Sequence, residues 1–238
     1  MVKIITYPLV LLWTAFCAIL GLLMSVVLRL KQFTLYLVPG RLWAPVLFFL
    51  MGIKIKSSGQ QNIDPYTPSI FVVNHGSFLD IPASAMEIPL NLYYIVKKEL
   101  KKAPFIGWYI TATDHIYVDR KNKEAARESM RIAAERINKG KHVLAYPEGT
   151  RSKDDSVRIF RRGSFIIAKN GDIPIIPVGI TGAHDCLPPG KFWWKKGTIE
   201  VIIGEPIRPS DHPDSGPEDL AEMARQAVIA LREQGVED

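Results

Sequence analysis

The sequence contains little cysteine. Cys17 and Cys186 are the two cysteines among 238 residues, which is too few for a disulfide framework or a cysteine-based zinc site. This shortage favours a reducing compartment. Four of the five histidines also lack the spacing of metal ligands, so we expect no metal site and assign these side chains to the core or the surface. They are His115, His142, His184 and His212.

Several motifs of common enzyme classes are also absent. There is no Gly-x-Ser-x-Gly nucleophile motif, no Walker phosphate loop and no Gly-x-Gly-x-x-Gly dinucleotide motif. The chain therefore lacks the signatures of serine hydrolases of the α/β type, of P-loop nucleotidases and of nicotinamide-dependent enzymes.

Acidic residues are missing from the first 53 positions, which carry four basic residues. The other 185 residues are nearly balanced, with 26 basic and 24 acidic side chains. The net charge of +6 is thus concentrated around an apolar segment and does not indicate nucleic-acid binding. We expect no nucleic-acid partner.

A long uncharged run near the N-terminus predicts a membrane anchor. Residues 4–28 contain no charged side chain, and about 20 apolar residues suffice to span a hydrocarbon core of roughly 30 Å. A core helix of a soluble protein is the alternative. We expect the anchor to lie in the cell (inner) membrane. Only Lys3 precedes the run and three basic residues follow it, so the positive-inside rule predicts that the rest of the chain lies on the cytoplasmic side.

A second apolar run, Leu42–Ile53, is too short to span a membrane and contains Pro45. Pro39 and Gly40 are expected to break any helix before it, so we predict that it lies in the membrane interface. The sequence leaves open whether the two runs make one full span or a helical hairpin in one leaflet. We divide the chain into an anchor, residues 1–53, and a second domain, residues 54–238.

After residue 53, strand-like apolar runs alternate with helical patterns. This alternation predicts an α/β domain with a mostly parallel central sheet flanked by helices. Strands are expected at residues 53–56, 69–73, 92–96, 116–119, 142–146, 175–181 and 198–203. Helices are expected at residues 78–87, 122–138, 160–169 and 217–232.

Polar side chains directly follow four of the predicted strands. Ligands bind outside the carboxyl ends of strands in open α/β sheets, so the four junctions predict one shared site. The junctions are Asn74–Asp80, Asp119–Arg120, Tyr146–Ser152 and Gly179–Gly182.

His75 and Asp80 form the first candidate pair. If Ser77 caps the next helix, Asp80 is the last residue of a Ser-x-x-Asp capping box, and His75 lies in the preceding turn within reach of its carboxylate. A carboxylate on one ring nitrogen leaves the other free to take a proton from a hydroxyl group, as a general base does. The alternative is that Asp80 only caps the helix.

The turn Pro147–Ser152 is a candidate phosphate site. Gly149 permits close approach of a ligand to the backbone, and Arg151 has the planar fork that matches phosphate oxygens. Arg120, at another strand end, supplies a second fork. The alternative is a solvated turn in which Glu148 and Arg151 pair with each other.

A cluster of lysines surrounds Glu99. It indicates contact with lipid headgroups or with an anionic acyl carrier, and a solvated helix face is the alternative. The cluster consists of Lys97, Lys98, Lys101 and Lys102.

Taken in order, the four junctions resemble the four motifs of the glycerolipid acyltransferase family, and most closely those of the 1-acyl-sn-glycerol-3-phosphate acyltransferases. The resemblance covers roughly residues 50–205. The matching segments are His75 to Asp80 for His-x4-Asp, Asp119–Arg120 for the second motif, Tyr146–Ser152 for Phe-Pro-Glu-Gly-Thr-Arg-Ser, and Ile175–Val178 for the fourth. The departures are Asp114 in place of the usual glycine, Tyr146 in place of phenylalanine, and Gly76 where a larger residue is common.

This resemblance implies a reaction. His75, oriented by Asp80, would deprotonate the sn-2 hydroxyl of lysophosphatidate, which would attack the thioester of acyl-CoA or acyl-carrier protein. The acyl donor is then a co-substrate, and no metal or other cofactor is implied; membrane lipids are the remaining partners. The residues implied to hold the glycerol phosphate are Arg120, Glu148, Gly149, Thr150 and Arg151.

Two other functions fit the sequence. The acceptor could be another lysolipid, such as a lysophospholipid or a lyso-ornithine lipid. Alternatively, the protein could be a catalytically silent lipid-binding module of the membrane. The intact His75 and Asp80 disfavour the silent module, because a binding protein needs no oriented base.

Overall fold

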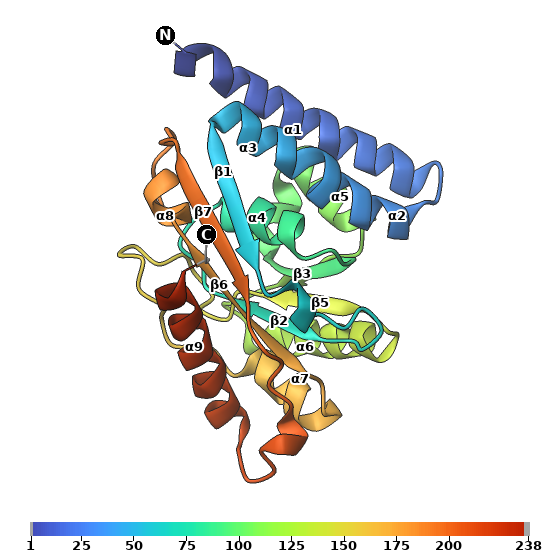
Figure 1. Ribbon diagram of the computed structural model, residues 1–238. Helices are drawn as coiled ribbons and strands as arrows, with labels where there is room; N and C mark the ends of the chain where they lie inside the picture. Colours follow the sequence, from blue (N-terminus) through green and yellow to red (C-terminus); the bar gives the residue numbers. More distant parts are fainter. Residues whose placement is uncertain (1, 236–238) are drawn as a thin grey trace.

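Two apolar helices begin the chain and lie side by side as a hairpin (Figure 1). The computed structural model describes residues 2–235. The first helix is α1 (Val2–Val26). The second consists of α2 (Lys31–Tyr36), a π-helical turn (Leu37–Trp43) and α3 (Ala44–Met51). The indole N–H of Trp13 donates to the carbonyl of Trp43 at 3.1 Å and joins the two helices.

The predicted helix break at Pro39 and Gly40 is wrong. The wider π-helical turn accommodates a proline that has no N–H to donate, so the helix continues through it. Gly40 instead allows close packing, since a Cβ atom there would lie 2.1 Å from the carbonyl oxygen of Ala85. Two stretches, Thr6–Val26 and Lys31–Met51, are 21 residues each and are long and apolar enough to cross a membrane. The second helix is therefore longer than the predicted interfacial segment, whose place in the interface stays a prediction.

A seven-stranded sheet follows, with the strand order β1-β7-β6-β2-β5-β3-β4. Every neighbouring pair is parallel except β6 and β7, which are antiparallel. All seven predicted strands are confirmed, with small shifts at their ends. Their bounds are β1 (Ile53–Ser58), β2 (Ile70–Val73), β3 (Leu92–Lys97), β4 (Ile116–Val118), β5 (His142–Ala145), β6 (Ile175–Thr181) and β7 (Gly197–Ile203).

The four predicted helices are also present, and two shorter helices were not predicted. The predicted helices are α4 (Asp80–Glu87), α6 (Lys123–Asn138), α7 (Gly163–Gly171) and α9 (Pro217–Gln234). The additional helices are α5 (Ile106–Ala112) and α8 (Ala183–Cys186). Helices of one or two turns repeat no apolar spacing, so the sequence pattern does not reveal them.

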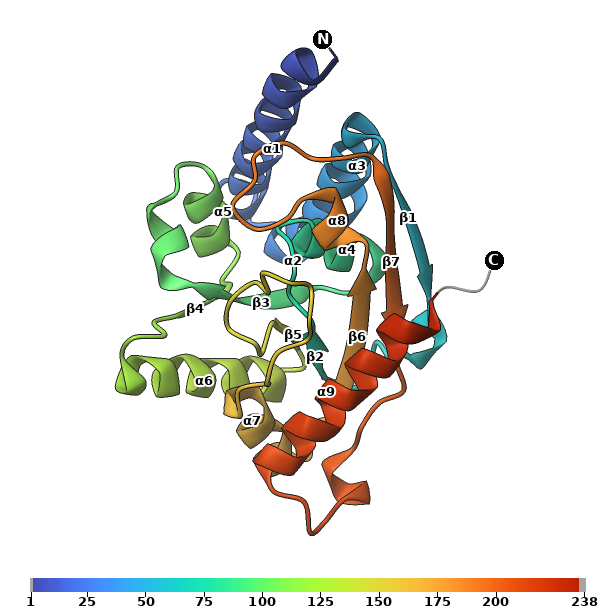
Figure 2. The same ribbon diagram turned by 90° about the vertical axis from the view of Figure 1, so that its left-hand side faces the viewer.

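The sheet is buried on both faces (Figure 2). Phe71 and Val73 of β2 pack in one hydrophobic cluster with α3 and α4, whereas Ile70 and Val72 face a second cluster with α6, α7 and α9. Such continuous apolar strands are typical of parallel sheets covered by helices. β2 ends at Val73, so the polar residues that follow it lie at the carboxyl edge of the sheet. The division of the chain at residue 53 stays a prediction.

Candidate active site

The turn between β2 and α4 carries the candidate pair, and Asn74 fixes the start of this turn. The Asn74 amide donates to the carbonyl oxygen of Ile180 at 2.9 Å, and its oxygen accepts from the Ile180 N–H at 2.7 Å. Asn74 is buried, so both bonds form away from water, where an unpaired amide would be costly. The turn is thereby tied to the neighbouring strand β6.

His75 and Asp80 are in direct contact. Nδ1 of His75 lies 2.7 Å from Oδ2 of Asp80, and the same oxygen accepts from the N–H groups of Gly76 at 2.9 Å and Ser77 at 2.8 Å. The Asp80 side chain is 1% exposed and that of His75 is 14% exposed. The turn therefore holds the Asp80 carboxyl group against the imidazole of His75.

The predicted Ser77 cap is wrong in its geometry. α4 begins at Asp80, and Leu79 precedes it as the cap residue. The Ser77 hydroxyl accepts from the Leu79 N–H at 3.1 Å and donates to the Leu187 carbonyl at 2.8 Å. Ser77 therefore closes a tight turn before the helix. Asp80 is the first helical residue, yet it still reaches back to the Ser77 N–H as a capping box requires.

Tyr146 covers one face of the His75 ring. The two rings are stacked with their centroids 4.2 Å apart and their planes at 24°. The Tyr146 hydroxyl lies 3.2 Å from Oγ of Ser84. The aromatic side chain after β5 thus limits the rotation of the imidazole.

Glu148 holds the backbone of His75. Its Oε1 accepts from the His75 N–H at 2.8 Å, and the Ser152 N–H donates to the His75 carbonyl at 2.7 Å. Burial raises the pKa of Glu148 to about 7, against the lowering effect of the His75 N–H. Among residues 2–235, Glu148 forms no ion pair with Arg151, which contradicts the solvated-turn alternative.

Arg151, from the Pro147–Ser152 turn, packs on Phe78, which belongs to the turn that carries His75. Its guanidinium carbon is 3.6 Å from the centroid of the Phe78 ring, a cation–π contact. Burial lowers the pKa of Arg151, and the nearby Asp80 carboxylate opposes this shift. The Arg151 cation is thus close to the His75–Asp80 turn.

Arg120 interacts with a second cation, Arg161, which is not among the predicted site residues. Burial lowers the pKa of Arg120, and Arg161 lowers it further. Gly149 has a positive φ of 79°, and a Cβ atom there would lie 2.7 Å from Nε of Arg161. Within the described part of the chain, neither arginine forms an ion pair. Arg161 follows the Pro147–Ser152 turn by nine positions in the sequence. This short distance is the sequence signal that could have placed Arg161 near the turn.

Thr150 and Asp119 are two further residues of the predicted junctions. Thr150 is exposed. Asp119 accepts from Lys98 at 3.2 Å and from the Lys121 N–H at 3.0 Å, so it anchors the start of the lysine cluster. No group of three potential metal ligands occurs among residues 2–235.

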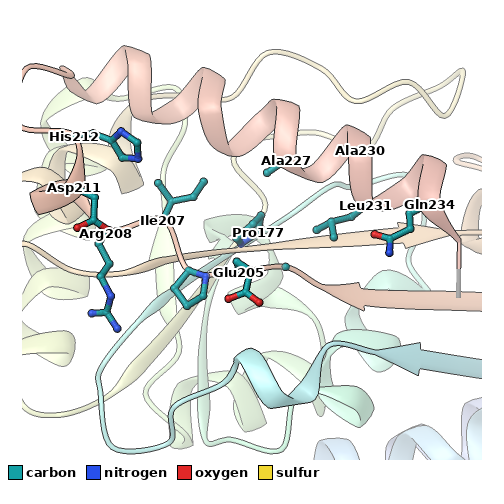
Figure 3. A pocket seen from close by; sticks show the side chains of 12 residues that line it. Pro177, Glu205, Ile207, Arg208, Asp211, His212, Ala227, Ala230, Leu231 and Gln234 are labelled. Atoms are coloured by element: carbon teal, nitrogen blue, oxygen red, sulfur yellow. The ribbon is translucent and has the colours of Figure 1, made fainter. Parts of the chain in front are cut away.

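A cavity of about 370 Å³ lies elsewhere, between α9 and the segment after β7 (Figure 3). Leu231 and Gln234 of α9 line it on one side, and Ile207 and Arg208 line it on the other. Pro177, from the Ile175–Val178 motif, belongs to its lining, whereas none of the predicted catalytic or phosphate-binding residues does.

The fold and the site together define a class. An α/β enzyme with an imidazole held by a carboxylate at the carboxyl edge of its sheet is equipped for proton transfer from a hydroxyl group. Comparison with known proteins is more specific. A family model described as Acyltransferase matches residues 54–181, and the chain belongs to this acyltransferase family.

Named relatives and a solved structure agree with this assignment. The chain is 30% identical over 233 residues to a 1-acyl-sn-glycerol-3-phosphate acyltransferase of Saccharomyces cerevisiae, covering 95% of this chain and 77% of that protein. A chloroplastic enzyme of the same name from Arabidopsis thaliana is 30% identical over 72% of this chain, which spans 48% of the plant protein. The crystal structure of the 1-acyl-sn-glycerophosphate acyltransferase PlsC from Thermotoga maritima superimposes with a TM-score of 0.79 at 26% identity, covering 98% of this chain and 97% of that one.

Proposed function

We propose that the chain transfers an acyl group from a thioester to the sn-2 hydroxyl of 1-acyl-sn-glycerol 3-phosphate and forms phosphatidate. The observation that carries this proposal is the 2.7 Å contact between Nδ1 of His75 and Asp80. Nε2 of His75 has no hydrogen-bond partner among residues 2–235, so it is available to accept the hydroxyl proton. The names of the yeast and Thermotoga proteins support the choice of acceptor.

In this mechanism, Nε2 of His75 takes the proton as the sn-2 oxygen attacks the thioester carbonyl. Asp80 stabilises the imidazolium that forms, as the acid of a catalytic triad does. The tetrahedral intermediate then expels the thiol sulfur, and the imidazolium returns its proton to that sulfur. The acyl carbon exchanges a C–S bond for a C–O bond, and no covalent acyl-enzyme is needed.

The acceptor phosphate is proposed to bind between Arg120 and Arg161, beside Gly149. The Arg161 cation lowers the pKa of Arg120, so an anion placed between the two guanidinium groups would offset their repulsion, and their forks suit phosphate oxygens. Arg151 and Thr150 are proposed to contact the glycerol end. Glu148 is proposed to act mainly by holding the His75 backbone.

Attachment to a membrane is proposed through the hairpin, with the sheet domain on the cytoplasmic side. Leu12, Phe16 and Val27 of the first helix and its turn are exposed apolar side chains, as lipid contact requires. An acceptor that remains in the bilayer can then reach His75. Acyl-CoA and acyl-carrier protein are both retained as donors.

The decisive experiment offers the purified full chain in micelles a panel of lysolipids with each donor. Lysophosphatidate should be the best acceptor. Faster acylation of a lysophospholipid or a lyso-ornithine lipid would indicate that this other lysolipid is the acceptor. No transfer to any acceptor, with lipid binding retained, would identify a catalytically silent module.

A further inference from the structure

The last turn of α9 contacts Asp155 and Ile180, two residues that lie against the turn that carries His75. α9 packs on β6 through Ala224 and Val228. The contact is close at Gly179, where a Cβ atom would lie 2.9 Å from Cβ of Leu231 and 3.2 Å from the backbone nitrogen of Arg232. Because β6 has a glycine at this point, the helix approaches near enough for Arg232 to reach across the edge of the sheet.

The Arg232 guanidinium makes three hydrogen bonds. Its Nε donates to the Ile180 carbonyl at 3.1 Å, Nη1 donates to the Asp155 carbonyl at 2.7 Å, and Nη2 donates to Oδ2 of Asp155 at 2.6 Å. The Arg232 side chain is only 15% exposed, so water weakens these charge-assisted bonds little. Burial raises the pKa of Asp155, and the guanidinium opposes that shift.

Asp155 in turn lies against the catalytic turn. It adopts a positive φ of 63°, which a non-glycine residue keeps only when its surroundings hold it there. A Cβ atom at Gly76 would be 2.9 Å from Oδ1 of Asp155. Gly76 separates His75 from Ser77, and its N–H is bonded to Asp80.

Arg232 also supports the same turn through Ile180 of β6. The Ile180 carbonyl that accepts from Arg232 also accepts from the Asn74 amide, and Asn74 directly precedes His75. Arg232 therefore supports the turn on two sides, through Asn74 by way of Ile180 and through Gly76 by way of Asp155.

We propose that Arg232 is a positioning residue for acyl transfer, which holds the His75–Asp80 turn in its reactive geometry through Asp155 and Ile180. Arg232 lies outside residues 54–181, which match the family model, and touches neither His75 nor Asp80. A misplacement of about 1 Å at a reacting group can cost about 100-fold in rate. Loss of Arg232 acts on kcat, since the phosphate-binding arginines remain in place.

The test compares Arg232→Ala with Arg225→Ala in the full chain. Arg225 is a matched control, because it also extends from α9 to the same loop, where it donates to the Val157 carbonyl at 3.2 and 3.1 Å without reaching Asp155 or Ile180. We expect Arg232→Ala to lower kcat by about 10- to 100-fold with little change in either KM. Arg225→Ala should lower the Tm by about as much as Arg232→Ala does, and it should leave kcat within about threefold of the wild type. Equal losses of kcat in both variants, or a kcat for Arg232→Ala within twofold of the wild type, would overturn the proposal.

A second arm separates positioning from folding. Asp155→Asn removes the charge of the side chain and keeps its volume. Because Asn tolerates a positive φ, the backbone conformation at this position is also kept. This variant should lower kcat in the wild-type background and have no further effect in Arg232→Ala, whereas additive losses would contradict a shared path. If Arg232→Ala does not fold, Arg232→Lys carries the same comparison, with a smaller loss of kcat.

The kinetic readout rests on the proposed function, so a spectroscopic readout accompanies it. The downfield proton signal of the His75–Asp80 hydrogen bond is identified by its disappearance in His75→Ala. This signal should shift or broaden in Arg232→Ala and remain unchanged in Arg225→Ala. An unchanged signal in both overturns the positioning role, whereas an inactive wild type with the expected shift overturns only the proposed function.

Discussion

Nδ1 of His75 and Oδ2 of Asp80 lie 2.7 Å apart although the two residues are five positions apart in sequence. On a regular helix, side chains with this spacing would point in different directions. The tight turn at Ser77 places His75 before the helix and Asp80 at its first position. The two functional groups are therefore brought together by local structure.

Replacing His75 with alanine should abolish most acyl transfer and leave the protein folded. The loss of a general base costs about 10²- to 10⁴-fold. Asp80→Asn should also be severe, because the amide keeps the size of the side chain and loses the charge. Initial rates and thermal unfolding measure the two effects separately. A rate above half that of the wild type in either variant would refute the role of that residue.

Replacing Arg120 with lysine should raise the KM for lysophosphatidate far more than the KM for the acyl donor. An ammonium group cannot make the paired bonds that a guanidinium makes with phosphate. Arg151→Lys should act in the same direction and also lose its contact with Phe78. Arg131→Lys is the control, since Arg131 pairs with Glu128 on the exposed face of α6. Equal changes in both KM values would indicate a structural role.

Tyr146→Phe should leave kcat within about threefold of the wild type, because the ring on His75 is retained. Its free energy of unfolding should fall by about 1 kcal/mol through loss of the bond to Ser84. Tyr146→Ala removes the ring and should lower both kcat and stability, the latter by at least about 2 kcal/mol. A kcat for Tyr146→Ala equal to that of Tyr146→Phe would show that stacking does not orient the imidazole.

The stability of the wild type should fall relative to Glu148→Gln as the pH rises. Burial raises the pKa of Glu148 from 4.5 to about 7, so the folded state binds this proton more tightly than the unfolded chain does. The stabilisation is complete below about pH 4.5 and is lost as the pH rises through about 7. Unfolding midpoints of both proteins between about pH 5 and 8 give the comparison. Parallel curves would contradict the raised pKa.

Removing residues 1–28 should weaken attachment to liposomes without abolishing it, because the second apolar helix remains. The truncated protein should act on short-chain monomeric acceptors and lose activity on long-chain acceptors in bilayers. Liposome flotation beside assays on both acceptors measures this. The paired substitution Leu12→Ser and Phe16→Ser, at exposed positions of α1, is a milder variant with the same expected direction. Undiminished turnover of the bilayer acceptor would refute a role in substrate access.

The strands and the His75–Asp80 pair were predictable because their signals are local. Most of the strands are short apolar runs, β1 alternates isoleucine with lysine, and His75 and Asp80 lie within one turn. The antiparallel direction of β7 has no comparable signal, since the side chains of a buried strand do not record its direction. The contact of Arg232 with Asp155 joins residues 77 positions apart, and no short pattern encodes it.

The helix break at Pro39 and Gly40 failed as a prediction for a physical reason. Sequence rules treat a Pro-Gly pair as a turn because they include no tertiary contacts. Here the glycine is required by the neighbouring backbone of Ala85, and the π-helical turn accommodates the proline. Tertiary packing therefore overrides the local preference of the Pro-Gly pair for a turn.

The contact between Gly40 and Ala85 joins the apolar hairpin to the helix that Asp80 begins. Gly52 alone connects α3 to β1, and Phe48 and Met51 of α3 share a hydrophobic cluster with the sheet. A tilt of the hairpin is therefore transmitted to the sheet and to Asp80 together. In the proposed membrane attachment, the depth of the hairpin in a lipid leaflet would set the height of His75 above that leaflet, so bilayer thickness is expected to affect how an acceptor lipid reaches His75.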